Sequence, residues 1–159
     1  MSSDDFHIRE ARPEDLAALI GLFAADALGG HGDTLDEAAR PHYERAFAAI
    51  MASPGDLLLV VEHAGEVVAT AQLTFIHSLP GRGALKMAIE AVQTRADMRS
   101  KGIGARLVNH CLALGRERGA VHAHLTSNAK RVDAHKFYER LGFEKSHAGF
   151  KMKLAPAST

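Results

Sequence analysis

The order of hydrophobic and polar residues shifts along the chain between a strand-like alternation and a helix-like spacing. Five apolar or alternating runs predict strands, at residues 6–9, 57–62, 67–76, 85–94 and 121–126. Apolar residues three and four positions apart predict four helices, one from residue 13 to the glycines at 29 and 30, and others over residues 34–51, 102–118 and 130–141. Residues 143–154 add terminal strand material.

This order of elements predicts one α/β domain built around a mixed sheet. The strand at 85–94, the helix at 102–118 and the strand at 121–126 form a crossover, which should be parallel and right-handed. The earlier strands should pair antiparallel, and helices should cover both faces of the sheet. We expect a single domain over residues 1–155, followed by a flexible tail at 156–159.

Composition narrows the class of protein. The chain has 159 residues, 47% of them hydrophobic, which suits one globular domain. Lys plus Arg equals Asp plus Glu at 19 each, so no net charge directs the chain to nucleic acid or to an anionic membrane. The longest apolar run, Leu57 to Val61, is too short to span a bilayer, and the first eight residues lack the apolar core of a signal peptide. With a single cysteine, we expect a cytoplasmic protein.

The segment from residue 92 to residue 105 carries the strongest candidate chemistry. A strand ends, a polar turn follows, and a helix opens at Gly102 and Gly104. The first N–H groups of a helix have no intrahelical partner, and with the helix dipole they attract an anion such as a pyrophosphate. Arg99 and Lys101 add positive charge beside them. The alternative is an ordinary helix start, and the glycines alone do not decide between the two.

Two common phosphate-binding motifs do not fit this turn. A dinucleotide fingerprint needs a third glycine where this chain has Leu107, and it needs a second mononucleotide-binding half. A Walker A loop needs a Gly-Lys-Ser/Thr triplet, which does not follow here.

The same turn resembles a family signature. Residues 99–104, Arg-Ser-Lys-Gly-Ile-Gly, resemble the Arg/Gln-x-x-Gly-x-Gly/Ala motif of the GCN5-related N-acetyltransferase (GNAT) family, which cradles the pyrophosphate of coenzyme A. The opening at residues 8–16 and the segment 134–143, which follows Asn128, are similar to other parts of that family. Ala96 departs from the proline that many members carry. The resemblance covers nearly the whole chain and implies a mostly antiparallel sheet of six to seven strands.

The resemblance also implies the ligand and its contacts. The chain should use acetyl-CoA as a co-substrate and no metal. The backbone N–H of Val92 should face the thioester carbonyl, and Gln93 and Thr94 should pair with the pantetheine arm as an added strand. The residues expected to bind the cofactor are Val92, Gln93, Thr94, Arg99, Ser100, Lys101, Gly102, Ile103, Gly104, Ala105, Asn128, Ala134 and Lys136.

Two side chains are candidates for proton transfer. Tyr138 matches the family tyrosine that protonates the departing sulfur, although its spacing beside Phe137 alone favours a core residue. Glu90 lies in an otherwise apolar strand and matches a glutamate that many members use as a base. A structural glutamate held by hydrogen bonds is an equal alternative, and burial would be needed to raise the pKa of a useful base.

The acceptor is less well defined by the sequence. The resemblance favours members that acetylate small amines, and it allows a homodimer. The loops at residues 28–35 and 76–83 should form the acceptor pocket, with His31, Asp33, His77 and Arg82 as its polar groups. Transfer to a protein lysine or N-terminus, and a non-catalytic acyl-CoA-binding sensor, remain open alternatives.

The histidines and the cysteine give weaker indications of a chemical role than the residues above. His122 and His124 alternate on one predicted strand and so share a face, but no Cys pair or other zinc spacing accompanies them. A structural or surface role is therefore the favoured interpretation. Cys111 lies among apolar helix residues and is expected to be a small core side chain.

Overall fold

The computed structural model describes residues 5–26 and 31–155, which fall into two compact units, Met1–Leu125 and Thr126–Thr159. The predicted glycine break at 29 and 30 and the predicted tail at 156–159 lie outside the described residues. The prediction of a single domain over 1–155 stays a prediction.

The first unit holds the sheet and four labelled helices. Its strands are β1 (Phe6–Glu10), β2 (Asp56–His63), β3 (Glu66–His77), β4 (Leu85–Thr94) and β5 (His122–His124). Its helices are α1 (Leu16–Ala24), α2 (Arg40–Ala52), the short turn α3 (Pro80–Gly83) and α4 (Ile103–Glu117). Single 3₁₀ turns, Pro13–Asp15, Glu37–Ala39 and Ala96–Met98, precede α1, α2 and α4.

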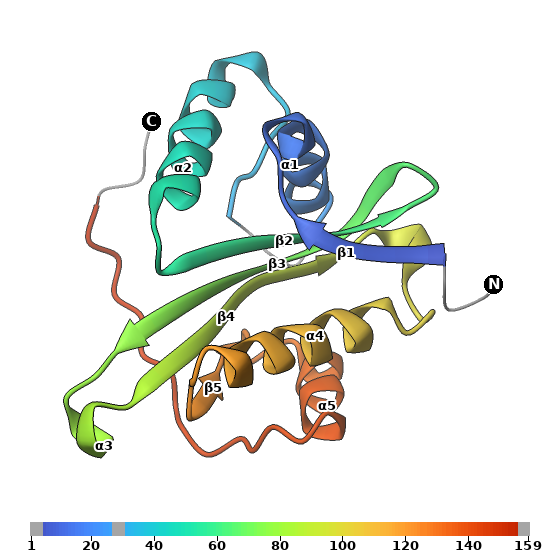
Figure 1. Cartoon of the computed structure of the whole chain (residues 1–159). Coiled ribbons are helices and arrows are strands. Elements are labelled where there is room, and N and C mark those ends of the chain that lie inside the picture. The colour runs from blue at the N-terminus through green and yellow to red at the C-terminus, as the bar shows by residue number, and fades with distance from the viewer. Residues whose placement is uncertain (1–4, 27–30, 156–159) are drawn as a thin grey trace. The chain divides into compact units, whose positions relative to one another are not determined.

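The five strands follow their order in the sequence, from β1 at one edge to β5 at the other. Neighbours pair antiparallel except β4 and β5, which pair parallel as the crossover predicts. Figure 1 shows α1 and α2 on one face of this sheet and α4 on the other. The predicted mixed α/β architecture, with helices on both faces, is confirmed.

Each face of the sheet packs a separate apolar layer. On the first face, α1 and α2 contribute Leu19, Ile20 and Phe47 to a buried cluster with Leu58 and Val60 of β2. On the other face, the buried side of α4 consists of Ile103, Leu107, Val108, Cys111 and Gly115. A Cβ at Gly115 would lie 3.0 Å from Cε of Met87, so glycine permits the close approach of α4 to β4.

Residues with positive φ form the turn of the β2–β3 hairpin and the end of α4. Ala64 and Gly65 connect β2 to β3 with φ of 52° and 78°, the positive values that two-residue turns of this kind require. At the end of α4, Gly119 has φ of 84° and donates its N–H to the carbonyl of Arg116 at 3.1 Å.

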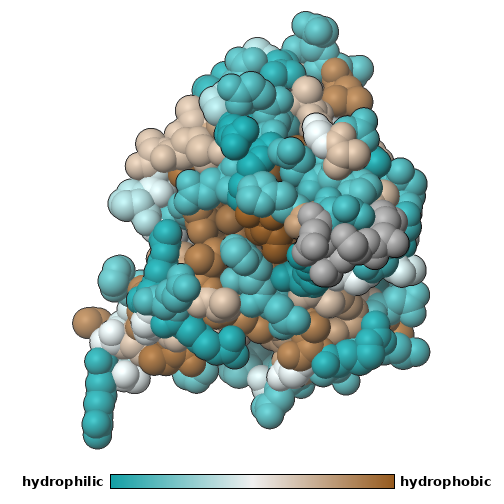
Figure 2. All heavy atoms as spheres, turned by 45° about the vertical axis from the view of Figure 1, so that its right-hand side comes forward, coloured by the Kyte–Doolittle hydropathy of each residue, from teal (hydrophilic) through white to brown (hydrophobic). Residues whose placement is uncertain are grey.

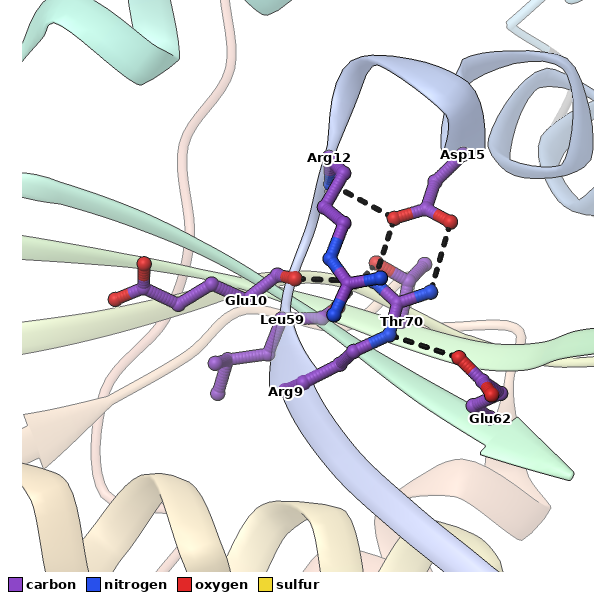
Figure 3. Close-up of polar contacts among 7 residues, drawn as sticks. All are labelled: Arg9, Glu10, Arg12, Asp15, Leu59, Glu62 and Thr70. Atoms are coloured by element: carbon purple, nitrogen blue, oxygen red, sulfur yellow. Dashed lines mark hydrogen bonds and ion pairs between the residues drawn. The ribbon is translucent and has the colours of Figure 1, made fainter. Parts of the chain in front are cut away.

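A charged network joins β1, β2 and the start of α1 (Figure 3). The Arg9 guanidinium donates to both carboxylate oxygens of Asp15, at 2.7 and 3.0 Å, and to Glu62 at 2.8 Å. Asp15 also accepts the backbone N–H of Arg12 at 2.7 Å. The side chains of Arg9 and Asp15 are only 13% and 9% exposed. The hydrogen bonds from Arg9 hold the pKa of the Asp15 carboxyl below its usual value.

The second unit contains one helix, α5 (Val132–Arg140), within its described residues. Gly142, with φ of 100°, follows it. Residues 143–154 contain no strand, so the terminal strand material predicted there was wrong. Apolar residues alternate here as in a strand, at Phe150, Met152 and Leu154, but all three side chains are exposed. A strand also needs a neighbouring backbone to pair with, which the pattern alone does not supply.

Two further boundaries differ from prediction. The described residues form five strands rather than six to seven, and β5 has three residues rather than the six of 121–126. The second helix begins at Arg40 after a 3₁₀ turn, whereas the sequence predicted a start at residue 34. The Thr34 hydroxyl accepts the N–H of Asp36 at 3.1 Å, which forms a local turn instead of a helix cap.

Candidate functional site

The sheet leaves part of β4 open on the side of β5. The two strands pair only at Lys86–His122, Met87–Ala123 and Ala88–His124. From residue 89 to residue 94, β4 has no strand partner on this edge among the residues that the structure describes. An open edge presents backbone N–H and C=O groups that an extended ligand can join as an added strand. The edge contains Val92, Gln93 and Thr94.

A bulge bends β4 within this open stretch. Thr70 and Gln72 of β3 pair with Gln93 and Glu90, so three steps along β4 oppose two along β3. Ala91 takes the extra position and has φ of 52°, which a residue with a Cβ adopts rarely. Such conformations concentrate at functional sites because they re-aim the backbone. Nothing in the sequence around Ala91 signalled the bulge.

The turn after β4 leads into the start of α4. Ser100 and Gly102 have positive φ, of 62° and 79°. Gly102 is the N-cap residue of α4, and no side chain caps the first N–H groups of this helix. Alternating left- and right-handed residues direct successive N–H groups into one concavity, which binds anions. The buried side chains of Met98 and Ile103 anchor the turn on either side. The first N–H groups of α4, at Ile103, Gly104 and Ala105, lie at the positive end of the helix dipole.

The cations near this turn have different surroundings. Arg99 is exposed, and its Nε donates to the carbonyl of Thr94 at 3.2 Å, which holds the guanidinium beside the end of β4. Lys101 is also exposed. Arg95 instead binds Asp97 at 2.7 and 3.1 Å and Glu66 at 3.1 Å. Its hydrogen bonds lower the pKa of the Asp97 carboxyl. Arg99 and Lys101 are therefore better placed than Arg95 to meet an anion.

A hollow of about 480 Å³ lies beside the same end of β4. Its lining comes from α1, from the start of β3 and from the segment 93–99, and includes Ala18, Gly21, Gln93, Thr94 and Arg99. This size falls in the range of small-molecule sites. Figure 2, which brings the right-hand side of Figure 1 forward, shows recessed apolar surface bordered by hydrophilic residues. No pattern in the sequence indicated that α1 would line this hollow.

Glu90 lies exposed on β4, directly opposite Gln72 of β3. Its neighbours Met87 and Ile89 are 1% and 2% exposed. A useful base at this position would need a buried carboxylate, and β4 does not bury Glu90.

The other predicted residues belong to the second unit. Tyr138 on α5 is half-buried, and its ring packs edge-on against Phe137 and Phe143 at centroid distances of 5.0 and 5.7 Å. Asn128 accepts the N–H of Lys130 on its side-chain oxygen at 2.9 Å, as a turn-forming asparagine does. On α5, Ala134 is half-buried and Lys136 is exposed. The structure thus brings the predicted residues together in two groups, 90–105 and 128–138.

Among the loop residues considered for the acceptor, Asp33 has a defined partner. It accepts the hydroxyl of Tyr43 on α2 at 2.8 Å, and the same hydroxyl accepts the N–H of Thr34 at 3.1 Å. Burial is the main cause that raises the pKa of Tyr43. His31, His77 and Arg82 are exposed.

Comparison with known proteins decides the family. The sequence profile described as the acetyltransferase (GNAT) family matches residues 17–143. The chain belongs to the acetyltransferase (GNAT) family. The predicted assignment to the GNAT N-acetyltransferases, which use acetyl-CoA, is confirmed.

Two solved structures that are similar to this GNAT chain carry different descriptions. A crystal structure of a transcriptional regulator from Bacillus halodurans C-125 is 36% identical, with a TM-score of 0.90, and covers 94% of this chain and 99% of that one. AAC(6')-Iy in complex with the bisubstrate analogue CoA-S-monomethyl-acetylneamine is 15% identical, with a TM-score of 0.76, over 95% of this chain and 99% of that one. At that identity the likeness shows the fold alone.

A curated relative matches over a shorter stretch. The aminoalkylphosphonate N-acetyltransferase of Salmonella typhimurium is 40% identical over 57 residues, 36% of this chain and 37% of that protein. The match therefore spans little more than a third of the relative's length.

Two negative findings concern the described residues of this GNAT protein. No helix in residues 5–26 and 31–155 has the length and apolar character needed to cross a membrane. Within the same residues, no group of three or more His, Cys, Asp and Glu side chains is arranged to hold a metal ion.

Proposed function

We propose that this chain transfers an acetyl group from acetyl-CoA to the primary amine of a small molecule. One observation carries the proposal: the open edge of β4 leads directly into a left-handed turn and an uncapped helix start. An extended pantetheine arm fits the first feature and a pyrophosphate fits the second. The family assignment supports the same ligand.

The residues fit this ligand by type as well as by position. Val92, Gln93 and Thr94 would pair with the pantetheine amides through their backbone. The turn from Arg99 to Ala105 would hold the pyrophosphate with N–H groups and two exposed cations. By the family resemblance, Asn128, Ala134 and Lys136 would also contact coenzyme A. Acetyl-CoA would supply the activated acyl group.

The chemistry has three requirements that side chains or backbone must meet. The amine must lose its proton before it attacks, although a free alkylamine has a pKa near 10.4. The developing negative charge on the carbonyl oxygen needs a donor, for which we propose the N–H of Val92. The departing sulfur needs a proton, for which we propose the hydroxyl of Tyr138. Glu90 would attract the cationic amine or accept its proton.

The small-amine acceptor rests on the curated relative, which is named for an aminoalkylphosphonate. A second candidate function is an acyl-CoA-binding sensor without catalysis. It is favoured by the transcriptional regulator that is 36% identical over most of the chain. Transfer to a protein amine is a third outcome that the same experiment separates.

A two-step experiment tests the proposal. Thermal unfolding is first measured with coenzyme A and with acetyl-CoA. A ligand at a hundred times its Kd stabilises by about 2.7 kcal/mol, which corresponds to a rise in Tm of roughly 5–11 °C for a chain of this size. Mass spectrometry then follows acetyl transfer to ethanolamine, 2-aminoethylphosphonate, spermidine and a lysine-containing peptide.

The outcomes separate the candidates. Acetylation of one of the three small amines supports the proposal, whereas acetylation of the peptide alone supports a protein acetyltransferase. A thermal shift with no product supports the sensor. No shift with either coenzyme A derivative would overturn every acyl-CoA-dependent function.

A further inference from the structure

We propose that His124 accepts the proton from the acceptor amine, beside Glu90. The proposal rests on the acetyl transfer proposed above and names a residue of the same site. The sequence favoured a structural or surface role for this histidine, because no zinc-binding spacing accompanies His122 and His124.

The register of the sheet shows which face that is. His124 pairs with Ala88 and His122 pairs with Lys86, while Met87 pairs with Ala123 between them. Met87 is 1% exposed and lies against α4, since a Cβ at Gly115 would meet its sulfur at 3.1 Å. Side chains of adjacent residues on a strand point to opposite faces. Both histidines therefore lie on the face opposite α4.

Glu90 lies on this same face. It is two residues beyond Ala88 on β4, so it shares the face of Ala88 and is the diagonal neighbour of His124. Two residues advance about 6.6 Å along a strand and neighbouring strands lie about 4.8 Å apart, so the Cα atoms of Glu90 and His124 should be about 8 Å apart. That spacing leaves room for an ammonium group between the carboxylate and the imidazole. Both side chains are exposed.

The two histidines differ in their position along the sheet. His124 belongs to the last pair of β4 and β5, at the point where the open edge of β4 begins. His122 lies two register pairs further from that edge, opposite Lys86. A thioester held along the open edge would have its reacting end at this junction, near His124 rather than His122. Imidazole changes charge between pH 5 and 8, which suits a proton acceptor at neutral pH.

The other polar groups on this face do not provide a better base. From β4 the face carries Lys86 and Glu90, and from β3 it carries Gln72 and Thr74. Thr74 donates its hydroxyl to Asp56 of β2 at 2.7 Å, so that carboxylate already has a partner. Gln72 and Thr74 do not titrate near neutral pH. The imidazole nitrogens in this group are those of the two histidines.

The proton balance of the reaction is straightforward. The ammonium gives one proton to His124, which releases it to solvent, and the neutral nitrogen bonds to the acyl carbon. As the carbon–sulfur bond breaks, the sulfur takes a proton from Tyr138, and a second proton from nitrogen restores that hydroxyl. The amine ends as an amide with one hydrogen, and one proton leaves in net.

His122 provides a matched control, because it has the same side chain, strand, face and exposure class. The experiment compares His124→Gln with His122→Gln, using the fastest acceptor among the four amines tested above. Folding is checked by Tm and cofactor binding by the Kd for acetyl-CoA, which should be unchanged in both. We expect His124→Gln to lower kcat/KM at pH 7 by about 100-fold or more, the usual effect of losing a general base. His122→Gln should stay near wild type.

Two further readouts distinguish proton transfer from a structural role. The loss in His124→Gln should shrink as pH rises toward the pKa of the amine, because solvent then deprotonates the acceptor. In His124→Ala, added imidazole should restore part of the rate. Equal kcat/KM and pH profiles for the two glutamine variants, or no rescue by imidazole, would overturn the role of His124 alone. A wild-type protein that acetylates no amine would overturn the proposed function, and the role of His124 with it.

Discussion

The Arg9–Asp15 pair offers a quantitative test of what holds α1 against the sheet. Asp15 accepts three hydrogen bonds, two from the Arg9 guanidinium and one from the Arg12 N–H. Asp15→Asn removes the charge while keeping the shape. Breaking a buried ion pair by removing one partner costs about 3–5 kcal/mol. Here Arg9 keeps Glu62 at 2.8 Å, and both side chains retain some exposure, so we expect the low end, about 3 kcal/mol.

The assay is thermal unfolding followed by circular dichroism. At 2–4 °C for each kcal/mol, the loss should lower Tm by roughly 6–12 °C at neutral pH. The control is Asp97→Asn, which removes an equally short pair of bonds from Arg95, at 2.7 and 3.1 Å. That pair is exposed, with 36% and 63% of the two side chains accessible, so its Tm should stay close to wild type.

The stabilisation that Asp15 provides should depend on pH in a definite direction. The pKa of Asp15 is lowered in the folded state, chiefly by the Arg9 hydrogen bonds. Its contribution is therefore complete above the unfolded value of 3.8 and is lost as pH falls through the lower folded value. The gap in Tm between wild type and Asp15→Asn should narrow as pH falls below 3.8. Equal effects of the Asp15 and Asp97 substitutions, or a gap that persists in acid, would refute this reasoning.

Three other substitutions test separate parts of the structure. Tyr138→Phe should leave the calorimetric Kd for acetyl-CoA unchanged and lower kcat; an unaltered kcat would remove the proposed acid. Gly102→Ala puts a Cβ at φ of 79°, which costs about 1–2 kcal/mol and should weaken coenzyme A binding in calorimetry; wild-type affinity and Tm would contradict the role of this turn. Gly21→Ala should raise Tm, because a Cβ there meets nothing within 4 Å and alanine favours a helix by about 0.5–1 kcal/mol. A fall in Tm would show that α1 packs differently.

The sequence predicted the elements whose signals are local. The strand predicted at 85–94 matches β4, and the helix predicted at 102–118 matches α4 to within one residue at each end. The length of β5 could not be predicted in this way, because a strand extends only as far as its neighbour pairs with it. Residues 143–154 alternate like a strand but have no partner in the structure described. Pairing between distant segments is not encoded in either segment alone.

In the candidate site, too, features with a local sequence signal were predictable and features that depend on strand pairing were not. The glycine turn at 99–104 was visible because glycine marks left-handed backbone, and the structure has that conformation at Gly102. The bulge at Ala91 was not visible, because alanine has no preference for the conformation that it adopts there. The candidate role of His124 depends on the register of β4 with β5, which period-two alternation does not specify.

The position of Cys111 has a practical consequence for measuring this enzyme. It is the single cysteine of the chain, it is 0% exposed on the buried side of α4, and burial raises the pKa of its thiol to about 12. Disulfide-exchange dyes react with thiolates that they can reach. The folded protein should therefore be silent toward such a dye, and the colour that develops during turnover would count released coenzyme A molecules directly.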